Sequence, residues 1–393
     1  MKKFFNQRKV EACYLCFLSS LLLMSVSIFF ASCKMTAEGI ISVSDNVKTP
    51  VLLEFSQKSV DSLSLYFSKE VELSDLEVRS GNMSAVGELI FSGEQIKVEP
   101  VGSHGEKQVL DLKVENQARD VENQGFQIQV IFTEIQKLYA GESYIFSGVA
   151  HDQEGNSLSF QVPFNGFNER VAGVVLSEVR TEASNADKEN AKIEYVELYV
   201  HTPGNLAGIS LSSAIDEKKY GEYVFPQVEV KKGEYILVHF RTAEEYKGRC
   251  IDETDSNLNA STAPDSCSDV RDFWVSGTSA RLGKDDAIVL RQRSPGSLMD
   301  VLLYARSDIS ETARKTLIPV AQELVVEGGW SGGADISSWV VSDGLSTTKI
   351  LARQNIAQIQ KAAEDGLELP VARKEDWLVK SGATPGLANF SDK

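Results

Sequence analysis

Residues 193–200 read IEYVELYV, and this stretch decides the fold. Its side chains alternate between two rows, with Ile193 and Tyr195 starting one row and Glu194 starting the other. A period of two residues is typical of a β-strand. Similar short segments follow one another along the second half of the chain, at 171–179, 205–211, 223–226, 233–239, 282–290 and 300–304. Many short strands separated by turns predict a β-sandwich.

The first half of the chain repeats this pattern. Alternating segments lie at 63–67, 88–91, 108–114 and 126–132. Two more, 143–149 and 158–162, flank the turn-forming cluster at 152–156 and predict a hairpin. The pattern LYFSKEV at 65–71, together with this hairpin, resembles the Ig-like domains of bacterial cell-surface proteins. We therefore expect an all-β chain of two Ig-like β-sandwich domains in tandem, the first at 49–166.

The second half also carries a series of ordered motifs. They are SEV at 177–179, EYVELY at 194–199, NLAGISL at 205–211, FP at 225–226, KGEY at 232–235, LGKDD at 282–286, DW at 376–377 and ATPGLAN at 383–389. In this order they resemble the lamin-tail domain as bacteria carry it, over residues 171–389 with insertions at 245–271 and 306–370. The resemblance implies a second Ig-like sandwich. Bacterial proteins with this domain are often secreted or anchored at the cell surface.

The second insertion carries the helical signals of the chain. Apolar residues at helical spacing predict a helix over 311–326, with Asp308 or Ser310 as its N-cap and a kink or early end at Pro319. A second short helix is predicted over 356–363, ending before Gly366. We expect both helices to cover an edge of the sandwich.

The N-terminus has the pattern of an export signal. A basic leader precedes an apolar run, which closes on Ala31 and Ser32 directly before Cys33. This resembles a bacterial lipoprotein signal peptide, which implies that residues 1–32 are removed and that Cys33 is acylated. Residues 33–48 would then form a polar tether. An ordinary signal peptide and an uncleaved transmembrane anchor remain open as alternatives.

The charge of the chain limits its partners. The leader carries four basic side chains and one acidic side chain, so its removal takes the formal charge from −16 to −19. Such an acidic protein repels nucleic acid and anionic surfaces. We expect the lipid to hold the protein at the bacterial cell envelope. The outer membrane or cell surface is favoured over the inner membrane, because Lys34 follows the acylated cysteine, where some lipoproteins carry an aspartate that retains them at the inner membrane. The partner of the protein would be a basic or neutral protein.

The cysteines and the acidic insertion are the main candidate sites. Cys250 and Cys267 remain after the leader and the acylated residue are set aside, and an exported chain favours a disulfide between them. The insertion also offers oxygen ligands at Asp252, Asp255, Asn257 and Asn259, and the last three of these match the start of a calcium-binding EF-hand loop. The match fails further along, so a solvated acidic loop and a calcium site of another type both stay open.

The remaining motifs favour binding over catalysis. The four histidines have no metal-ligand spacing, and the chain has no nucleophile elbow or phosphate-binding loop. Trp274 and Trp377 are expected in the core, whereas Trp330 and Trp339, in the second insertion, are candidates for partner contact. We expect that the protein is not an enzyme and uses no cofactor, and that it has a non-catalytic binding or scaffolding role. The alternative is an accessory or catalytic component of an extracellular hydrolase, a nuclease or phosphoesterase, because bacterial lamin-tail domains can accompany such modules.

Overall fold

The computed structural model describes residues 49–57, 59–103, 125–184, 188–214, 222–275, 277–292 and 297–390. The predicted signal peptide, the lipid-attachment site Cys33, the tether and the predicted strand at 108–114 lie outside these ranges. In the described ranges, no helix combines the length and the apolar character that crossing a membrane requires.

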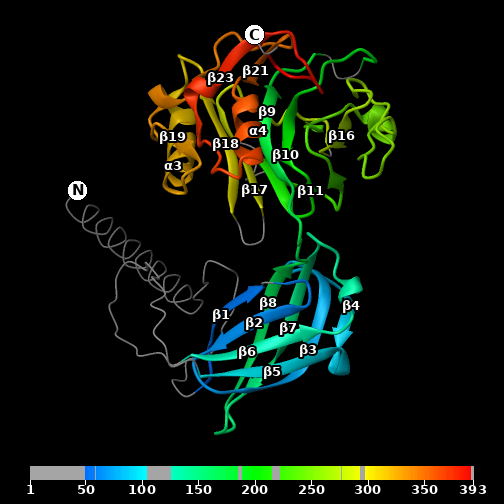
Figure 1. The fold of residues 1–393 in the computed structure, drawn as a ribbon, viewed down its shortest axis with the longest axis vertical. Helices are drawn as coiled ribbons and strands as arrows, with labels where there is room; N and C mark the ends of the chain where they lie inside the picture. Colours follow the sequence, from blue (N-terminus) through cyan, green and yellow to red (C-terminus); the bar gives the residue numbers. More distant parts are fainter. Residues whose placement is uncertain are drawn as a thin grey trace, which may run out of the picture. The chain divides into compact units, whose positions relative to one another are not determined.

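The chain forms two compact units, and both are built from β-sheets, as predicted. Unit 1 comprises Met1–Lys137 and Ser143–Phe164, and unit 2 comprises Leu138–Glu142 and Asn165–Lys393. Two helices are added to unit 2 (Figure 1).

Unit 1 contains two four-stranded antiparallel sheets, ordered β1-β2-β6-β5 and β4-β3-β7-β8. Their strands are β1 Leu52–Gln57, β2 Ser62–Phe67, β3 Glu72–Asn82, β4 Ala85–Ser92, β5 Ile96–Ser103, β6 Phe126–Phe132, β7 Ser143–His151 and β8 Ser157–Asn165. The buried rows of β2, β6 and β8 alternate with more exposed positions. This alternation is the period of two seen in the sequence.

Aromatic side chains fill the space between these two sheets. Phe132 of β6 stacks on Phe91 of β4, with 5.5 Å between ring centroids, and on Phe164 of β8, with 5.9 Å. Phe67 of β2 meets Phe160 of β8 edge to face at 6.0 Å. Each of these pairs joins strands of opposite sheets, so the aromatic cluster holds the sandwich of unit 1 together.

The predicted hairpin of unit 1 is present, and Asp152 organises its turn. Its Oδ1 accepts hydrogen bonds from the backbone amides of Glu154 and Asn156, at 3.0 and 2.8 Å, and Gly155 has a φ of +83°. Its Oδ2 accepts from Lys69 at 3.0 Å. Burial by itself would raise the pKa of Asp152, but the hydrogen bonds from Asn156 and Lys69 outweigh it and hold the pKa at about 2.

Unit 2 contains a six-stranded sheet, β16-β15-β10-β9-β21-β23, and a five-stranded sheet, β13-β12-β17-β18-β20. The strands of the first are β9 Gly173–Arg180, β10 Tyr195–Thr202, β15 Tyr235–His239, β16 Arg271–Trp274, β21 Lys349–Arg353 and β23 Trp377–Ser381. The strands of the second are β12 Ile209–Ser213, β13 Tyr223–Val224, β17 Asp286–Gln292, β18 Leu298–Ala305 and β20 Val340–Val341. Two short pairs complete the unit, β11 Gly204–Asn205 with β14 Glu229–Val230 and β19 Trp330–Ser331 with β22 Ala372–Arg373.

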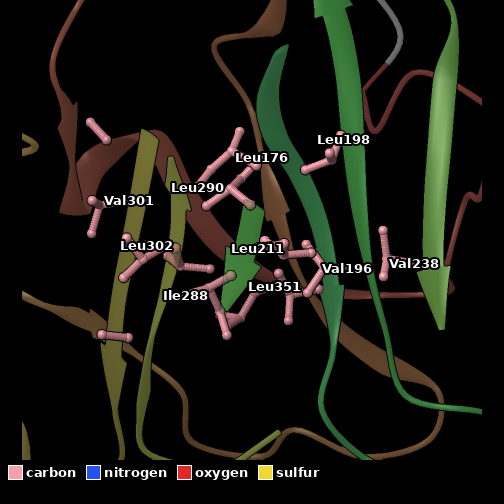
Figure 2. Packing of buried hydrophobic residues seen from close by; sticks show 14 of the residues in the cluster. Leu176, Val196, Leu198, Leu211, Val238, Ile288, Leu290, Val301, Leu302 and Leu351 are labelled. Carbon is pink, nitrogen blue, oxygen red and sulfur yellow. The ribbon is translucent and has the colours of Figure 1, made fainter. Parts of the chain in front are cut away.

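The core of unit 2 lies between its two large sheets. Figure 2 shows branched aliphatic side chains from both sheets meeting there, with Leu176, Val196, Leu198, Val238 and Leu351 from the first sheet and Leu211, Ile288, Leu290, Val301 and Leu302 from the second. The row of β10 that starts at Glu194 supplies this core. The other row, which includes Tyr195, Glu197 and Tyr199, is also buried because later parts of the chain cover it.

Both predicted helices are confirmed. Helix α3 spans Glu311–Val326 and runs through Pro319 without ending there, and the Ser310 hydroxyl caps it by accepting from the amide of Ala313. Helix α4 spans Ile356–Glu364 and is followed by Gly366, which has a φ of +65°. Ile359 of α4 packs on Val175 and Tyr199, so this helix covers the outer face of β9 and β10 rather than an edge (Figure 1).

The segment 306–370 is more than an insertion of helices. It also contains β20, which extends the five-stranded sheet, and β21, which lies between β9 and β23 in the six-stranded sheet. The expectation that this segment only adds helices to an already complete sandwich is therefore wrong, because the segment also supplies strands to both sheets. The sequence did not reveal this because KILAR, the whole of β21, is only five residues long.

The hairpin of unit 1 gives a test of its electrostatics. Because the pKa of Asp152 is about 2 in the folded chain and about 3.9 in an unfolded one, its carboxylate stabilises unit 1 above that unfolded value. This stabilisation should be lost as the pH falls from about 4 toward 2. The variant D152N should lower the stability of unit 1 at pH 7, and the difference from the wild type should shrink through that acidic window, as followed by amide hydrogen exchange of β7 and β8. The exposed neighbour variant E154Q serves as the control, and an equal effect of E154Q would contradict the assignment.

Candidate binding groove beside the acidic insertion

An open groove of about 830 Å³ lies beside the acidic insertion of unit 2. One wall is the turn 231–234 between β14 and β15, and the other is the segment 254–258 of the insertion. Arg271, the first residue of β16, lies in the lining as well. The volume is in the range of ligand sites in proteins. The insertion that the sequence singled out therefore borders a concave surface, which we call the β14–β15 groove.

Arg271 fixes the spacing of the two walls. Its Nε donates to Glu234 on the turn at 2.9 Å. Its Nη1 donates to the carbonyl oxygens of Glu253 and Asp255 on the insertion, at 2.8 Å for Asp255. A guanidinium has several donors in a planar arrangement, so one buried side chain can hold both segments at once.

Most charges in the groove are already paired. Glu229 accepts hydrogen bonds from Asn205 at 3.0 Å and from Arg170 at 2.6 Å, and these bonds lower its pKa. Lys232 forms an ion pair with Glu364 of α4 at 2.5 Å. Lys231 is exposed, and its ammonium has no partner among the residues that the structure describes. The groove thus presents one free positive charge among polar groups of fixed geometry.

Three of the four calcium candidates accept hydrogen bonds from the protein itself. Asp252 is turned inward, where it accepts from the amide of Trp274 at 2.7 Å and from the hydroxyl of Tyr223 at 3.1 Å. Asp255 accepts from the amide of Asn257 at 2.8 Å, and Asn257 accepts from the amide of Asn259 at 3.2 Å. These side chains order the insertion itself. In the described ranges, no group of three or more acidic, histidine or cysteine side chains is placed to hold a metal ion.

The predicted disulfide is wrong, because Cys250 and Cys267 are both free in the structure. Their thiols face different carbonyl oxygens, that of Tyr246 at 3.5 Å for Cys250 and that of Pro385 at 3.8 Å for Cys267. Burial, together with nearby acidic groups such as Asp272, raises the pKa of Cys267 to about 11. This thiol therefore stays protonated at neutral pH and is a poor nucleophile.

The expectation that Trp330 and Trp339 face a partner is also wrong. Their exposed fractions are 2% and 1%, and both belong to the core of unit 2. Trp330 lies in β19 and donates from its indole to the carbonyl oxygen of Ser338 at 3.3 Å. Gly328, with a φ of +82°, and Gly329 lie in the turn that leads from α3 into β19. Trp274 and Trp377 are buried, as predicted.

The histidines gave no signal in the sequence, and one of them is part of a buried network. His239 of β15 is fully buried, stacks on Trp274 with 4.1 Å between ring centroids, and lies 2.9 Å from Asp272 through its Nε2. Its Nδ1 has no hydrogen-bond partner within the ranges that the structure describes. Only the parallel pairing of β15 with β16 brings these residues together. His151 is exposed, His201 is partly buried, and His104 lies outside the described ranges.

A second buried network holds the end of the chain. Glu178 and Glu197 are direct partners across β9 and β10, and residues 382–389, which we call the closing segment, lie over them. Glu178 accepts from the amide of Thr384 at 3.1 Å, and Glu197 accepts from the amide of Gly386 at 2.7 Å. Burial, and then the charge of Glu178, raises the pKa of Glu197 well above its ordinary value. The closing segment is thus fastened to a carboxylate pair.

Unit 2 is therefore a β-sandwich with a polar groove on one side and a closing segment fastened to its six-stranded sheet. A model of the family described as "TP_1001_2nd: protein second domain" matches residues 172–379, and the chain belongs to this family. An "Uncharacterized protein" of Treponema pallidum (strain Nichols) is 29% identical over 203 residues, covering 50% of this chain and 49% of that protein. The chain thus spans about half the length of the curated relative that it matches. No solved structure matches the chain.

The carboxylate pair predicts how the stability of unit 2 depends on pH. Because the folded state raises the pKa of Glu197, it binds a proton more tightly than the unfolded chain does. Stability should therefore fall as the pH rises above the unfolded value of about 4.3. The variant E197Q keeps an oxygen acceptor for the amide of Gly386 but carries no charge. It should raise the free energy of unfolding at pH 7, with the difference vanishing near pH 4.

All four tryptophans of the chain lie in the sequence of unit 2, so denaturation followed by tryptophan fluorescence reports on this unit alone. The exposed-site variant E375Q is the matched control and should leave the curve unchanged. A lower stability of E197Q at pH 7 would show that the carboxylate is needed in its charged form.

Proposed function

We propose that the protein is a lipid-anchored protein of the bacterial cell envelope that binds a partner protein without catalysis, through the β14–β15 groove of unit 2. The observation that carries this proposal is the groove itself. Its two walls are fixed by Arg271, and it is lined by polar side chains that are largely paired with one another. A surface of fixed shape with satisfied charges is suited to recognition.

The chemistry of the groove supports binding rather than turnover. The acidic side chains Glu229 and Glu234 are engaged by Arg170 and Arg271, so neither is poised to move a proton. His239 is fully enclosed and does not line the groove. What remains accessible is the ammonium of Lys231, the exposed carboxylate of Asp255 and uncharged polar groups such as Gln227 and Ser256. This combination fits a polypeptide segment of mixed polarity with at least one acidic side chain.

Two further assignments belong to the same proposal. The lamin-tail resemblance is supported by the ATPGLAN motif at 383–389, because this motif supplies the closing segment that is fastened to β9 and β10. The anchor is supported by the order of basic, apolar and small residues before Cys33. We place the protein at the outer membrane or cell surface, held by acyl chains on that cysteine.

The anchor is tested by replacing Cys33 with serine. Each methylene of an acyl chain contributes about 0.8 kcal/mol to membrane binding, so the loss of several chains should release the protein. We expect wild-type protein in the detergent phase of a phase-separation experiment and C33S in the aqueous phase. If C33S stays in the detergent phase, the N-terminal apolar run is itself the anchor.

The groove is tested by photo-crosslinking in intact envelopes. A benzophenone amino acid at Gln227, in the groove, should yield a discrete crosslinked protein, because the partner would lie against this position. The same probe at Lys315, on the exposed face of α3, is the control and should not yield that product. The charge reversal K231E should reduce the crosslink from Gln227, whereas K315E should not.

Crosslinking from Lys315 but not from Gln227 would place the binding surface elsewhere. An undiminished product in K231E would show that the free ammonium does not contribute to recognition.

A further inference from the structure

A second, smaller cavity lies in unit 2, and none of its lining residues belongs to the β14–β15 groove. Its volume is about 120 Å³, and it lies between the start of β18, the turn after α3, helix α4 and the segment that leads into β22. Its apolar lining includes Val175, Leu298, Met299, Ile359, Leu369 and Pro370. A cavity of about 150 Å³ in another protein accommodates benzene, so this one has room for a slightly smaller group, such as the isobutyl group of a small ligand.

Two buried charged side chains, Arg353 and Asp300, line this cavity beside its apolar residues. Arg353 has an exposed side-chain fraction of 1%. Its Nε donates to Asn355 at 2.9 Å, and its Nη1 donates to Asp300 at 2.5 Å and to the carbonyl oxygen of Leu176 at 3.1 Å. The Nη2 amino group has no acceptor among the described residues. Arg353 lines the cavity and Nη2 is not one of the fully enclosed unpaired atoms, so Nη2 is the donor that this side chain has left for a ligand there.

The charge balance of the cavity selects a neutral occupant. Asp300 compensates the charge of Arg353, and the rim residue Glu327 is paired with Arg291 at 2.5 Å. An anionic ligand would add an uncompensated negative charge next to Asp300 in a buried place, which is costly. A neutral carbonyl oxygen can accept from Nη2 without that cost, while an attached aliphatic group fills the apolar part.

We propose that this cavity binds a small neutral group that consists of a branched aliphatic body and one carbonyl oxygen, with the oxygen accepting a hydrogen bond from Nη2 of Arg353. A leucine or valine residue of a peptide has this chemistry, and so does a free short-chain amide. The cavity would hold the group as an anchor pocket, separate from the groove and independent of whether the groove binds a partner.

The test uses the full-length protein with labelled methyl groups, and isovaleramide as the probe. We expect the methyl signals of Met299 and Ile359 to shift saturably, with a dissociation constant of about 1 mM for so small a ligand. Isovalerate at pH 7 has the same shape but carries a negative charge. Its binding should be weaker than that of isovaleramide by a factor of at least about ten. The absence of a saturable shift with isovaleramide, or tighter binding of isovalerate, would overturn the proposal.

Variants separate the cavity from other surfaces. R353K removes the Nη2 donor but disturbs an ion pair between the two sheets, so a second variant is needed that leaves this pair intact. L369W fills the cavity from a partly exposed position and should weaken isovaleramide binding about tenfold. L367W makes the same change two residues away, at a side chain with 63% exposure that does not line the cavity, and should bind as the wild type does. Equal binding by L369W and the wild type would overturn the site.

A last comparison distinguishes the two sources of the ligand. N-acetyl-leucine amide carries the same aliphatic body within a peptide unit, and N-acetyl-glycine amide lacks that body. Binding of the leucine derivative but not the glycine derivative supports a peptide residue as the occupant. Binding of isovaleramide without the leucine derivative supports a free short-chain amide.

Discussion

The sandwich of unit 2 depends on how one irregular position in β9 is satisfied. Glu197 of β10 pairs with Glu178, but the next residue, Leu198, pairs with Leu176, so Ser177 is a bulge without a partner on β10. Both faces of β9 are buried, and water cannot supply the missing hydrogen bonds. The strand therefore needs partners from other parts of the chain.

Three distant side chains supply these partners. Asp300 of β18 accepts from the amide of Leu176 at 2.8 Å, and Arg353 of β21 donates to the carbonyl oxygen of the same residue. Asn389 donates to the carbonyl oxygen of Ser177 at 3.0 Å. Asp300 and Arg353 also bind each other, and because they belong to different sheets their ion pair ties the two layers together. Removing one member would leave the other as an unpaired buried charge, which typically costs about 3–5 kcal/mol.

The same arrangement creates both the closing segment and the small cavity. The bulge returns Glu178 to the outer face, beside Glu197, where the two carboxylates receive the amides of Thr384 and Gly386. On the side of β21, both members of the ion pair line the small cavity, together with Ile359 of helix α4. The β14–β15 groove is built differently, since Arg271 joins two loops there. Fold and candidate sites thus rest on a few charged side chains that bridge segments far apart in the sequence.

The sequence by itself determined the elements whose signals are local. Alternation at 126–132 and 193–200 predicted strands, Asp308 or Ser310 marked the start of α3, and Gly366 marked the end of α4, because periodicity and capping act over a few residues. The tertiary structure alone decided which side chains meet. It placed Trp330 in the core, left Cys250 and Cys267 as free thiols, and joined Asp300 to Arg353 across two sheets. These outcomes depend on strand order and on the burial of both faces of a sheet, and such long-range pairings leave no pattern in neighbouring residues.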